Sequence, residues 1–257
     1  MISKEAKANI LICMPTYRNL IVADTVFSLT TLKDYLAENG IGSKFTYVES
    51  FDVVTARNIM ATYFFENEAY THLLFIDDDM IFEAPPILDM LRADKPIIGC
   101  VCTKRSLDLE RLFSGALEGK SFSSAMADSV EFALKHRADS SLTIADGLCQ
   151  IEGIGMAVTM IQRRVLGEML GSGCVKRRAL KPTGATDALG NLHHFGFFDQ
   201  IQVEERESLL AEDYSFCLRW RRDCQGEIWA LVTPKIGHVG LFTFEGRYLD
   251  RLHSGRL

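Results

Sequence analysis

The sequence lacks the features of a membrane-spanning, secreted or zinc-binding protein. No apolar run approaches the roughly 20 residues that a helix needs to cross a bilayer. The residues before Asn9 carry charges of both signs and lead to only a short apolar run before Pro15, unlike a secretory signal peptide. The seven cysteines include no Cys-x-x-Cys pair and no histidine spacing typical of zinc, so we expect reduced thiols in the cytoplasm.

The sequence also has no excess of basic residues. Its 28 Lys and Arg against 34 Asp and Glu give a net charge of −6, which argues against broad binding of duplex nucleic acid. Lys176-Arg177-Arg178 is a local basic patch that a solvated loop explains most simply. No repeat or linker-like segment interrupts the 257 residues, and 47% hydrophobic content supplies a core, so we expect a single domain over residues 1–257.

The most informative stretch is His72–Met80, an apolar run that ends in Asp77, Asp78 and Asp79. A short apolar run bounded by charge predicts a strand that is buried on both faces, with Asp77 and Asp79 on one side. Like charges beside an apolar core are costly unless a cation offsets them, and hard oxygen ligands suit Mg²⁺ or Mn²⁺. A solvated acidic turn that merely ends the strand is an equally simple explanation.

The first hundred residues alternate between strand and helix patterns. The expected elements are a strand at 9–14, a helix at 22–40, a strand at 44–49, a helix from Asp52 or Thr55 to about 67, the strand before Asp77, a helix at 85–92 and a strand at 96–102. This alternation predicts an α/β fold with a doubly wound, mostly parallel sheet. Ligands bind such sheets at the carboxyl ends of the strands, where Thr16, Glu49 and Asp77 fall.

The second half of the chain carries weaker patterns. We expect a helix from Ser123 or Ser124 towards Arg137, a strand at 153–161 and helices at 163–170 and 209–224, followed by a strand at 228–232. Lys104 and Arg105 follow the strand at 96–102, so either could reach a phosphate, and a solvated surface pair is at least as simple an explanation. Residues 106–150 otherwise show no recognisable chemistry.

Residues 171–200 are rich in glycine and polar residues, which predicts a long mobile loop. Its aromatic residues Phe195, Phe197 and Phe198 could cover a ring-shaped substrate or could anchor the loop to the core. The tail Phe244–Leu257 could pack against a partner subunit or fray, so homo-oligomerisation stays open.

Several short motifs occur together in an order that is typical of one enzyme group. They are Pro15-Thr16-Tyr17, Ala56-Arg57-Asn58, Phe75–Asp79, Gly196–Asp199, Glu212–Arg219 and His238–Gly240. The chain closely resembles a family-2-like member of the GT-A fold glycosyltransferases. The resemblance covers residues 9–240, with 103–150 departing from it, and it implies a Rossmann-like three-layer α/β/α sandwich. Residues 9–102 then correspond to the nucleotide-sugar-binding part, and residues 150–240 to the part that binds the acceptor and completes the metal site.

The resemblance also implies roles for individual residues. Asp77 and Asp79 match the Asp-x-Asp motif, with Asp79 on the metal and Asp77 on the metal or the donor ribose. His238 matches a C-terminal histidine that completes the metal site, and Asp213 matches the base that activates the acceptor. The positions implied to hold the nucleotide sugar are Pro15, Thr16, Tyr17, Glu49, Arg57, Asp77 and Asp78. Glu49 departs from the family, which more usually has an aspartate there.

The implied activity is sugar transfer from a nucleoside-diphosphate sugar, with UDP favoured, to an acceptor hydroxyl, assisted by Mn²⁺ or Mg²⁺. One carboxylate base suffices for inversion, while a retaining outcome stays open. A metal-dependent nucleotidyltransferase is an alternative, although no Gly-rich basic loop follows the first strand. A non-catalytic sugar-binding module is another, because carboxylates in the first turn of a helix, such as Glu212 and Asp213, can simply stabilise its dipole.

Overall fold

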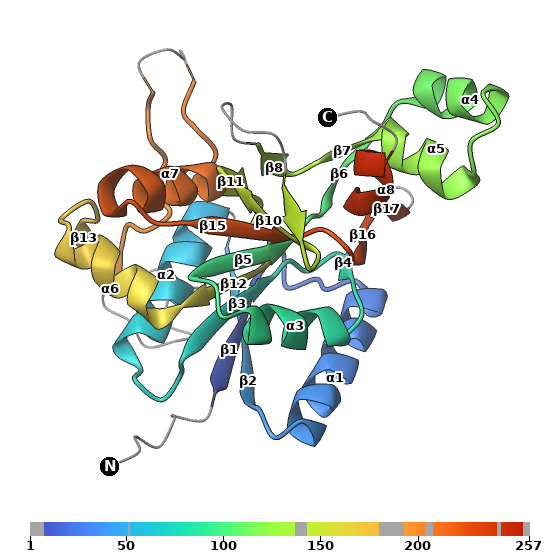
Figure 1. Ribbon diagram of the computed structural model, residues 1–257. Coiled ribbons are helices and arrows are strands. Elements are labelled where there is room, and N and C mark those ends of the chain that lie inside the picture. Colours follow the sequence, from blue (N-terminus) through green and yellow to red (C-terminus); the bar gives the residue numbers. More distant parts are fainter. Residues whose placement is uncertain are drawn as a thin grey trace.

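The computed structural model describes residues 8–50, 52–136, 143–179, 193–203, 208–240 and 243–253. Over these residues the protein is a mixed α/β structure, with helices on both faces of an eight-stranded sheet of order β2-β1-β3-β12-β5-β15-β10-β9 (Figure 1). The strands of this sheet are β1 (Asn9–Thr16), β2 (Gly42–Glu49), β3 (His72–Ile76), β5 (Ile97–Cys100), β9 (Ile144–Ala145), β10 (Leu148–Ile151), β12 (Val158–Gln162) and β15 (Ile228–Leu231).

The sheet is mostly parallel, as the sequence predicts. β1 pairs in parallel with β2 and β3, and β5 pairs in parallel with β15. Only β12 and β10 run against the other strands of this sheet. The single strand expected at 153–161 was wrong, because a turn divides it. β11 (Gly153–Ile154) pairs with β8 (Leu134–Lys135), whereas β12 enters the central sheet between β3 and β5.

Two hydrophobic cores lie on opposite faces of the sheet. The described helices are α1 (Ala23–Glu38), α2 (Val53–Glu66), α3 (Pro85–Ala93), α4 (Leu109–Leu117), α5 (Phe122–Ser129), α6 (Arg163–Gly171), α7 (Glu212–Cys224) and α8 (Tyr248–His253). Strand β1 turns Ile10 and Ile12 to the core formed with α1 and α3. It turns Leu11 and Cys13 to the core formed with α2, α6 and α7. This alternation produces the three-layer arrangement. No described helix is long and apolar enough to span a membrane.

The helices that precede the site begin and end close to the expected residues. The Asp52 carboxylate caps α2 by accepting hydrogen bonds from the backbone N–H groups of Val54 and Thr55. In α1, Leu32 and Leu36 are buried as expected, but Val26 is 43% exposed. The helical spacing of Val22, Val26, Leu29, Leu32 and Leu36 predicts that Val26 faces inward, but Thr25 and Ser28 are the residues buried there, so the prediction for Val26 was wrong.

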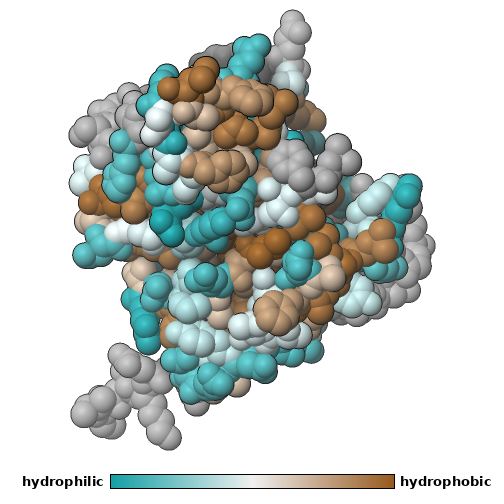
Figure 2. Space-filling model, turned by 90° about the vertical axis from the view of Figure 1, so that its right-hand side faces the viewer, coloured by the Kyte–Doolittle hydropathy of each residue, from teal (hydrophilic) through white to brown (hydrophobic). Residues whose placement is uncertain are grey.

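The segment after β5 contains short elements that the sequence did not predict. The helix expected from Ser123 or Ser124 towards Arg137 is the short α5, which Ser121 caps and which ends at Ser129, where β7 (Val130–Phe132) and β8 follow. α4, which Asp108 caps, precedes it and was not predicted. Strands β6 (Thr103–Leu107) and β7 flank the two helices as an antiparallel pair. α4 exposes the apolar side chains of Leu109, Phe113 and Leu117. Figure 2 shows apolar side chains gathered over α4 and α5 near the top of this face.

The aromatic residues near the end of the expected loop belong to the core. β13 (Arg177–Ala179) pairs with β14 (His193–Phe195), and the Phe197 and Phe198 side chains are fully buried. The Phe198 ring stacks on that of Phe216 in α7 at a centroid distance of 4.5 Å. For Phe197 and Phe198 these contacts confirm the alternative that the aromatic residues anchor the segment to the core. Residues 180–192 of the expected loop lie outside the described residues.

The described C-terminal residues, up to 253, form the strand β17 (Thr243–Arg247) and the helix α8, so over this range the expectation of a frayed tail was wrong. β17 pairs with β16 (Lys235–Val239), and β16 pairs with β4 (Met80–Ile81). The helix expected at 209–224 begins only at Glu212. It ends where Gln225, rather than Gly226, adopts the left-handed conformation with φ 55°.

Candidate functional site

The carboxylates of Asp77, Asp78 and Asp79 lie between β3 and β4, at the carboxyl end of the parallel strands. They line a cavity of about 320 Å³. Its other lining residues come from the end of β1, the start of α2, β6 and β16; they are Pro15, Thr16, Tyr17, Ser50, Val53, Ala56, Arg105 and His238. The structure thus brings Pro15-Thr16-Tyr17, the aspartates and His238 together, although they are up to 223 residues apart in sequence, from 15 to 238.

Asp79 contacts two basic side chains. Its Oδ2 lies 2.9 Å from Nη2 of Arg105 and 3.3 Å from Nε2 of His238. The antiparallel pairing of β16 with β4 sets His238 opposite Met80 and so beside Asp79. His238 Nδ1 lies 2.7 Å from the Thr103 carbonyl oxygen, to which it donates, so Nε2 faces Asp79. Burial alone would lower the pKa of His238, but the hydrogen bonds to Asp79 and Thr103 hold it above its ordinary value.

Asp77 has a different partner. The Arg57 guanidinium is 3% exposed, and its Nη2 lies 2.9 Å from Asp77 Oδ1. Its Nε lies 3.3 Å from Oε1 of Glu212, so one buried arginine joins the end of β3 to the start of α7. Strand alternation predicted that Asp77 and Asp79 share a side, but the regular strand ends at Ile76 and the two carboxylates have different partners. Nη1 of Arg57 has no hydrogen-bond partner among the described residues.

Glu212 is the residue that the sequence analysis missed. It was considered only as a dipole partner in the first turn of α7, whereas its carboxylate is 16% exposed and pairs with Arg57. The signal was present in the motif that places an acidic pair at a helix start. The partner could not be identified, because Arg57 is 155 residues away in sequence.

Asp78 lies on the side of the cavity that faces the loop after β1. Its Oδ2 accepts a hydrogen bond of 3.3 Å from the backbone N–H of Tyr17. Burial, with added repulsion from Asp79 and Asp77, raises the pKa of Asp78 to about 6. The hydroxyl oxygen of Thr16 is buried nearby and has no partner among the described residues. A carboxylate under repulsion and an unpaired hydroxyl are groups that a bound cation or polar ligand would stabilise.

Glu49 lies outside the cavity, and Asn58 holds a neighbouring segment of the chain. Glu49 ends β2, but the cavity lining includes its neighbour Ser50 and not Glu49. Asn58, from the same helical motif as Arg57, accepts a hydrogen bond of 2.7 Å from the Phe198 N–H and donates one of 3.0 Å to Asp199. The motif around Asp199 therefore holds the chain against α2.

The donor set at Asp79 suits a divalent cation that also binds phosphate oxygens. Within the described ranges, no three His, Cys, Asp or Glu side chains are arranged to hold a metal by themselves. Asp79 and His238 offer a carboxylate oxygen and an imidazole nitrogen that face each other. Mg²⁺ commonly takes only one or two protein carboxylates, with substrate phosphates and water completing its shell. The residues present fit this incomplete type of site, in which Arg105 now pairs with Asp79.

Asp213 lies in the first turn of α7, directly after Glu212. Its Oδ1 accepts a hydrogen bond of 2.7 Å from the backbone N–H of Tyr214. Burial, with added repulsion from Glu212, raises the pKa of Asp213 to about 6. A carboxylate whose pKa lies near neutrality is suited to accept a proton. Asp213 does not line the cavity of the three aspartates, and its neighbour Glu212 pairs with Arg57, which in turn contacts Asp77.

Comparisons with known proteins show no close relative. No protein-family model matches the sequence, and no curated protein matches it. Among solved structures, A197 from STIV is 14% identical with a TM-score of 0.47, covering 90% of this chain and 86% of that one. A glycosyltransferase involved in glycosylation of the major capsid of PBCV-1 is 11% identical with a TM-score of 0.27, covering 62% of each chain.

A third solved structure is the 4-diphosphocytidyl-2C-methyl-D-erythritolsynthase from Anaerococcus prevotii. It is 8% identical with a TM-score of 0.31, and the match covers 71% of this chain and 82% of that one. All three TM-scores are below 0.5, so these likenesses carry no argument about the activity. The activity has to be argued from the side chains of the site.

Proposed function

We propose that this protein is a GT-A type, family-2-like glycosyltransferase that moves a sugar from a nucleoside-diphosphate sugar, UDP first, to an acceptor hydroxyl. The observation that supports this most directly is the cavity at the carboxyl end of β3. It combines Asp77, Asp78 and Asp79 with the loop after β1 and with His238. In open α/β sheets this edge is where nucleotides and related ligands bind.

Asp79 and His238 are the proposed ligands of a Mn²⁺ or Mg²⁺ ion, which would offset the negative charge of the leaving diphosphate. When a cation takes the place of Arg105 on Asp79, the Arg105 guanidinium becomes available to a diphosphate oxygen. Tyr17 and Ser50 line the same cavity and are proposed to contact the nucleoside. Arg57 holds Asp77 in place through their hydrogen bond of 2.9 Å.

Asp213 is the proposed general base. It takes the proton of the acceptor hydroxyl while that oxygen forms a bond to the anomeric carbon of the donor. The bond between the anomeric carbon and the diphosphate oxygen breaks, and its electron pair leaves with the diphosphate. A single displacement of this kind inverts the anomeric centre.

A thermal-shift experiment tests the donor half of this proposal. UDP, and GDP for comparison, should stabilise the protein in the presence of Mn²⁺ or Mg²⁺ and not in excess EDTA. At a hundred times Kd the stabilisation is about 2.7 kcal/mol, which is several degrees for a domain of this size. Equal stabilisation in EDTA would contradict the metal-assisted site. Release of pyrophosphate from a nucleoside triphosphate would show a nucleotidyltransferase instead, and binding without any transfer would show a sugar-binding module.

A further inference from the structure

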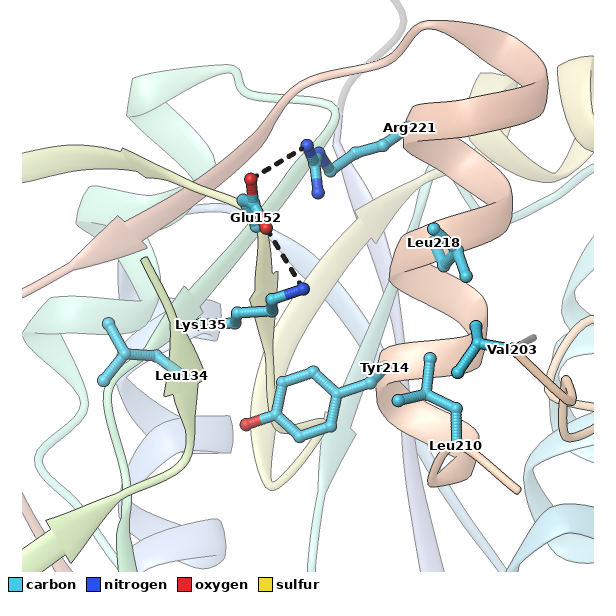
Figure 3. A pocket seen from close by; sticks show the side chains of 8 residues that line it. All are labelled: Leu134, Lys135, Glu152, Val203, Leu210, Tyr214, Leu218 and Arg221. Atoms are coloured by element: carbon cyan, nitrogen blue, oxygen red, sulfur yellow. Dashed lines mark ion pairs between the residues drawn. The ribbon is translucent and has the colours of Figure 1, made fainter. Parts of the chain in front are cut away.

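A second cavity, of about 460 Å³, lies beside α7 and shares no lining residue with the cavity of the three aspartates. Its volume is in the range of small-molecule binding sites, about 300–1,000 Å³. The lining residues come from β8, from the turn before β11, from the segment before α7 and from α7 itself; they are Leu134, Lys135, Glu152, Val203, Leu210, Tyr214, Leu218 and Arg221 (Figure 3).

One end of this cavity is polar. Glu152 is held between two cations, with Oε2 3.3 Å from Nζ of Lys135 and Oε1 3.3 Å from Nη2 of Arg221 (Figure 3). Both of its oxygens still have a lone pair for a ligand, and the ammonium and guanidinium groups have spare N–H donors. Adjacent hydroxyls of a sugar ring both donate and accept hydrogen bonds, so this trio offers them partners of both kinds.

The rest of the cavity is aromatic and aliphatic. Figure 3 shows the Tyr214 ring reaching from α7 towards Leu134 and Lys135, with Leu210 and Leu218 on the α7 side. The opposite edge of the ring rests on β11. A Cβ atom at Gly153 would lie 2.8 Å from Cδ1 of Tyr214, so only glycine at this position leaves room for the ring. The ring is therefore held in place as a flat apolar surface for a ligand.

Tyr214 connects this cavity to Asp213. The two residues are adjacent in the first turn of α7, and the Tyr214 N–H donates to the Asp213 carboxylate. The two side chains lie along the same short segment, since a Cβ atom at Gly153 would lie 2.8 Å from Cδ1 of Tyr214 and one at Gly155 would lie 3.6 Å from Oδ2 of Asp213. Asp213 does not itself line the cavity, so a ligand on the Tyr214 ring would contact the residue next to the carboxylate proposed as the base.

We infer that this cavity binds the acceptor, and that the acceptor is a neutral sugar ring that carries an apolar group. The ring hydroxyls contact the Lys135–Glu152–Arg221 trio, and the apolar group contacts Tyr214 and the leucines. This inference rests on the proposed function for the identity of the ligand as an acceptor. The existence of the binding site does not depend on any transfer reaction.

The test uses octyl β-glucoside, below its micelle concentration, as the probe and measures its affinity by ligand-observed NMR. Leu218→Trp fills the cavity and should weaken binding at least about tenfold. Leu209→Trp is the matched control, because Leu209 is 52% exposed and does not line the cavity. Glu152→Gln keeps the shape but removes the carboxylate, and should weaken binding about 2- to 10-fold. This second variant keeps the test decisive if Leu218→Trp fails to fold.

Two comparison probes test the class of ligand. Methyl β-glucoside keeps the sugar ring without the octyl chain, and 1-octanol keeps the octyl chain without the sugar. Each should bind more weakly than octyl β-glucoside. An affinity unchanged by Leu218→Trp and Glu152→Gln would overturn the site. Equal binding of 1-octanol would overturn the sugar, and tighter binding of octyl β-glucuronide would show that the cavity prefers an anion.

Failure of this inference and failure of the proposed function give different results. If UDP binds with Mn²⁺ but the glucoside does not bind, the donor site stands and the acceptor lies elsewhere. If the glucoside binds in this cavity but no nucleotide stabilises the protein, a sugar site remains and the glycosyltransferase proposal fails. If both bind, Leu218→Trp should lower sugar transfer to the glucoside without changing UDP affinity.

Discussion

The cavity at the ends of the parallel strands and the cavity beside α7 differ in how their charges are arranged. The first is lined by the three carboxylates of Asp77, Asp78 and Asp79 but, among the described residues, by just two basic side chains, those of Arg105 and His238. The second has one carboxylate, Glu152, between two cations. A metal cation suits the first arrangement and a neutral or anionic ligand suits the second. Under the proposed function, the first cavity would take the donor and the second the acceptor.

The Arg57–Glu212 pair connects α2 to α7, the helix that lines the second cavity. Arg57 contacts Asp77, which lines the first cavity, and Glu212 precedes Asp213 and Tyr214, of which Tyr214 lines the second. The pair therefore fixes the distance between the ends of β3 and α7. The predictions that follow change one side at a time and begin with the largest expected effect.

Asp213→Asn should lower sugar transfer about 10²–10⁴-fold, because asparagine keeps the size of the side chain but cannot accept the proton. UDP binding with Mn²⁺ should barely change, since Asp213 does not line the donor cavity. Initial rates and thermal shifts on the same preparation measure the two effects. Transfer by the wild-type enzyme should invert the anomeric centre. A variant with wild-type turnover, or a product that retains the donor configuration, would exclude Asp213 as the base.

Arg57→Met should destabilise the protein by about 3–5 kcal/mol, because it leaves two carboxylates without their buried partner. Urea unfolding measures the change. Lys104→Met is the matched control, since the Lys104–Glu131 pair is 53% and 64% exposed. Exposed pairs contribute only about 0–1 kcal/mol. Similar losses in the two variants would show that Arg57 does not connect the two cavities energetically.

The two cavities also differ in how far the sequence alone could predict them. The apolar run before Asp77 predicted a buried strand, and consecutive aspartates at its end were visible without any structure. The β-α-β-α-β alternation predicted that the loop after β1 lies beside them, as the parallel pairing of β1 and β3 confirms. Site residues that are adjacent in sequence, or that lie at the ends of neighbouring strands, can therefore be predicted from the sequence alone.

The acceptor-side cavity could not be predicted, because its residues share no local pattern. Leu134 and Arg221 are separated in the chain by α6 and by β9, β10 and β12 of the central sheet, and Glu152 lies in the turn between β10 and β11. The sequence could not decide between a substrate-covering and a core position for Phe197 and Phe198 for a related reason. Glycine and polar neighbours resemble a loop, whereas the tertiary contact with Phe216 decides their position. Long-range packing overrides local composition at both places.

Asp79→Asn should weaken the Mn²⁺-dependent binding of UDP at least about 10- to 100-fold, because an amide oxygen is a poorer metal ligand than a carboxylate. Asp89→Asn is the control, since this aspartate has 57% of its side chain exposed on α3. Titration with UDP at fixed Mn²⁺ measures the affinity. If Asp79→Asn binds UDP with unchanged affinity, the cation does not bind at Asp79. The acceptor-side cavity should bind its glucoside normally in this variant.

Asp213→Asn should also make the protein more stable at neutral pH, which is the smallest expected effect. An aspartate whose folded pKa is raised from 3.8 to about 6 favours the folded state most when it is protonated. This contribution to the stability of the folded state is fully present below the unfolded pKa and is lost as the pH rises through about 6. Above that pH, the charged Asp213 carboxylate destabilises the folded state. The substitution removes this cost, on the order of 1–3 kcal/mol. Urea unfolding at pH 4 and pH 7.5 should therefore show little difference between variant and wild type at the lower pH and a more stable variant at the higher one. A gain of the same size at both pH values would mean that the carboxylate does not titrate as its burial predicts.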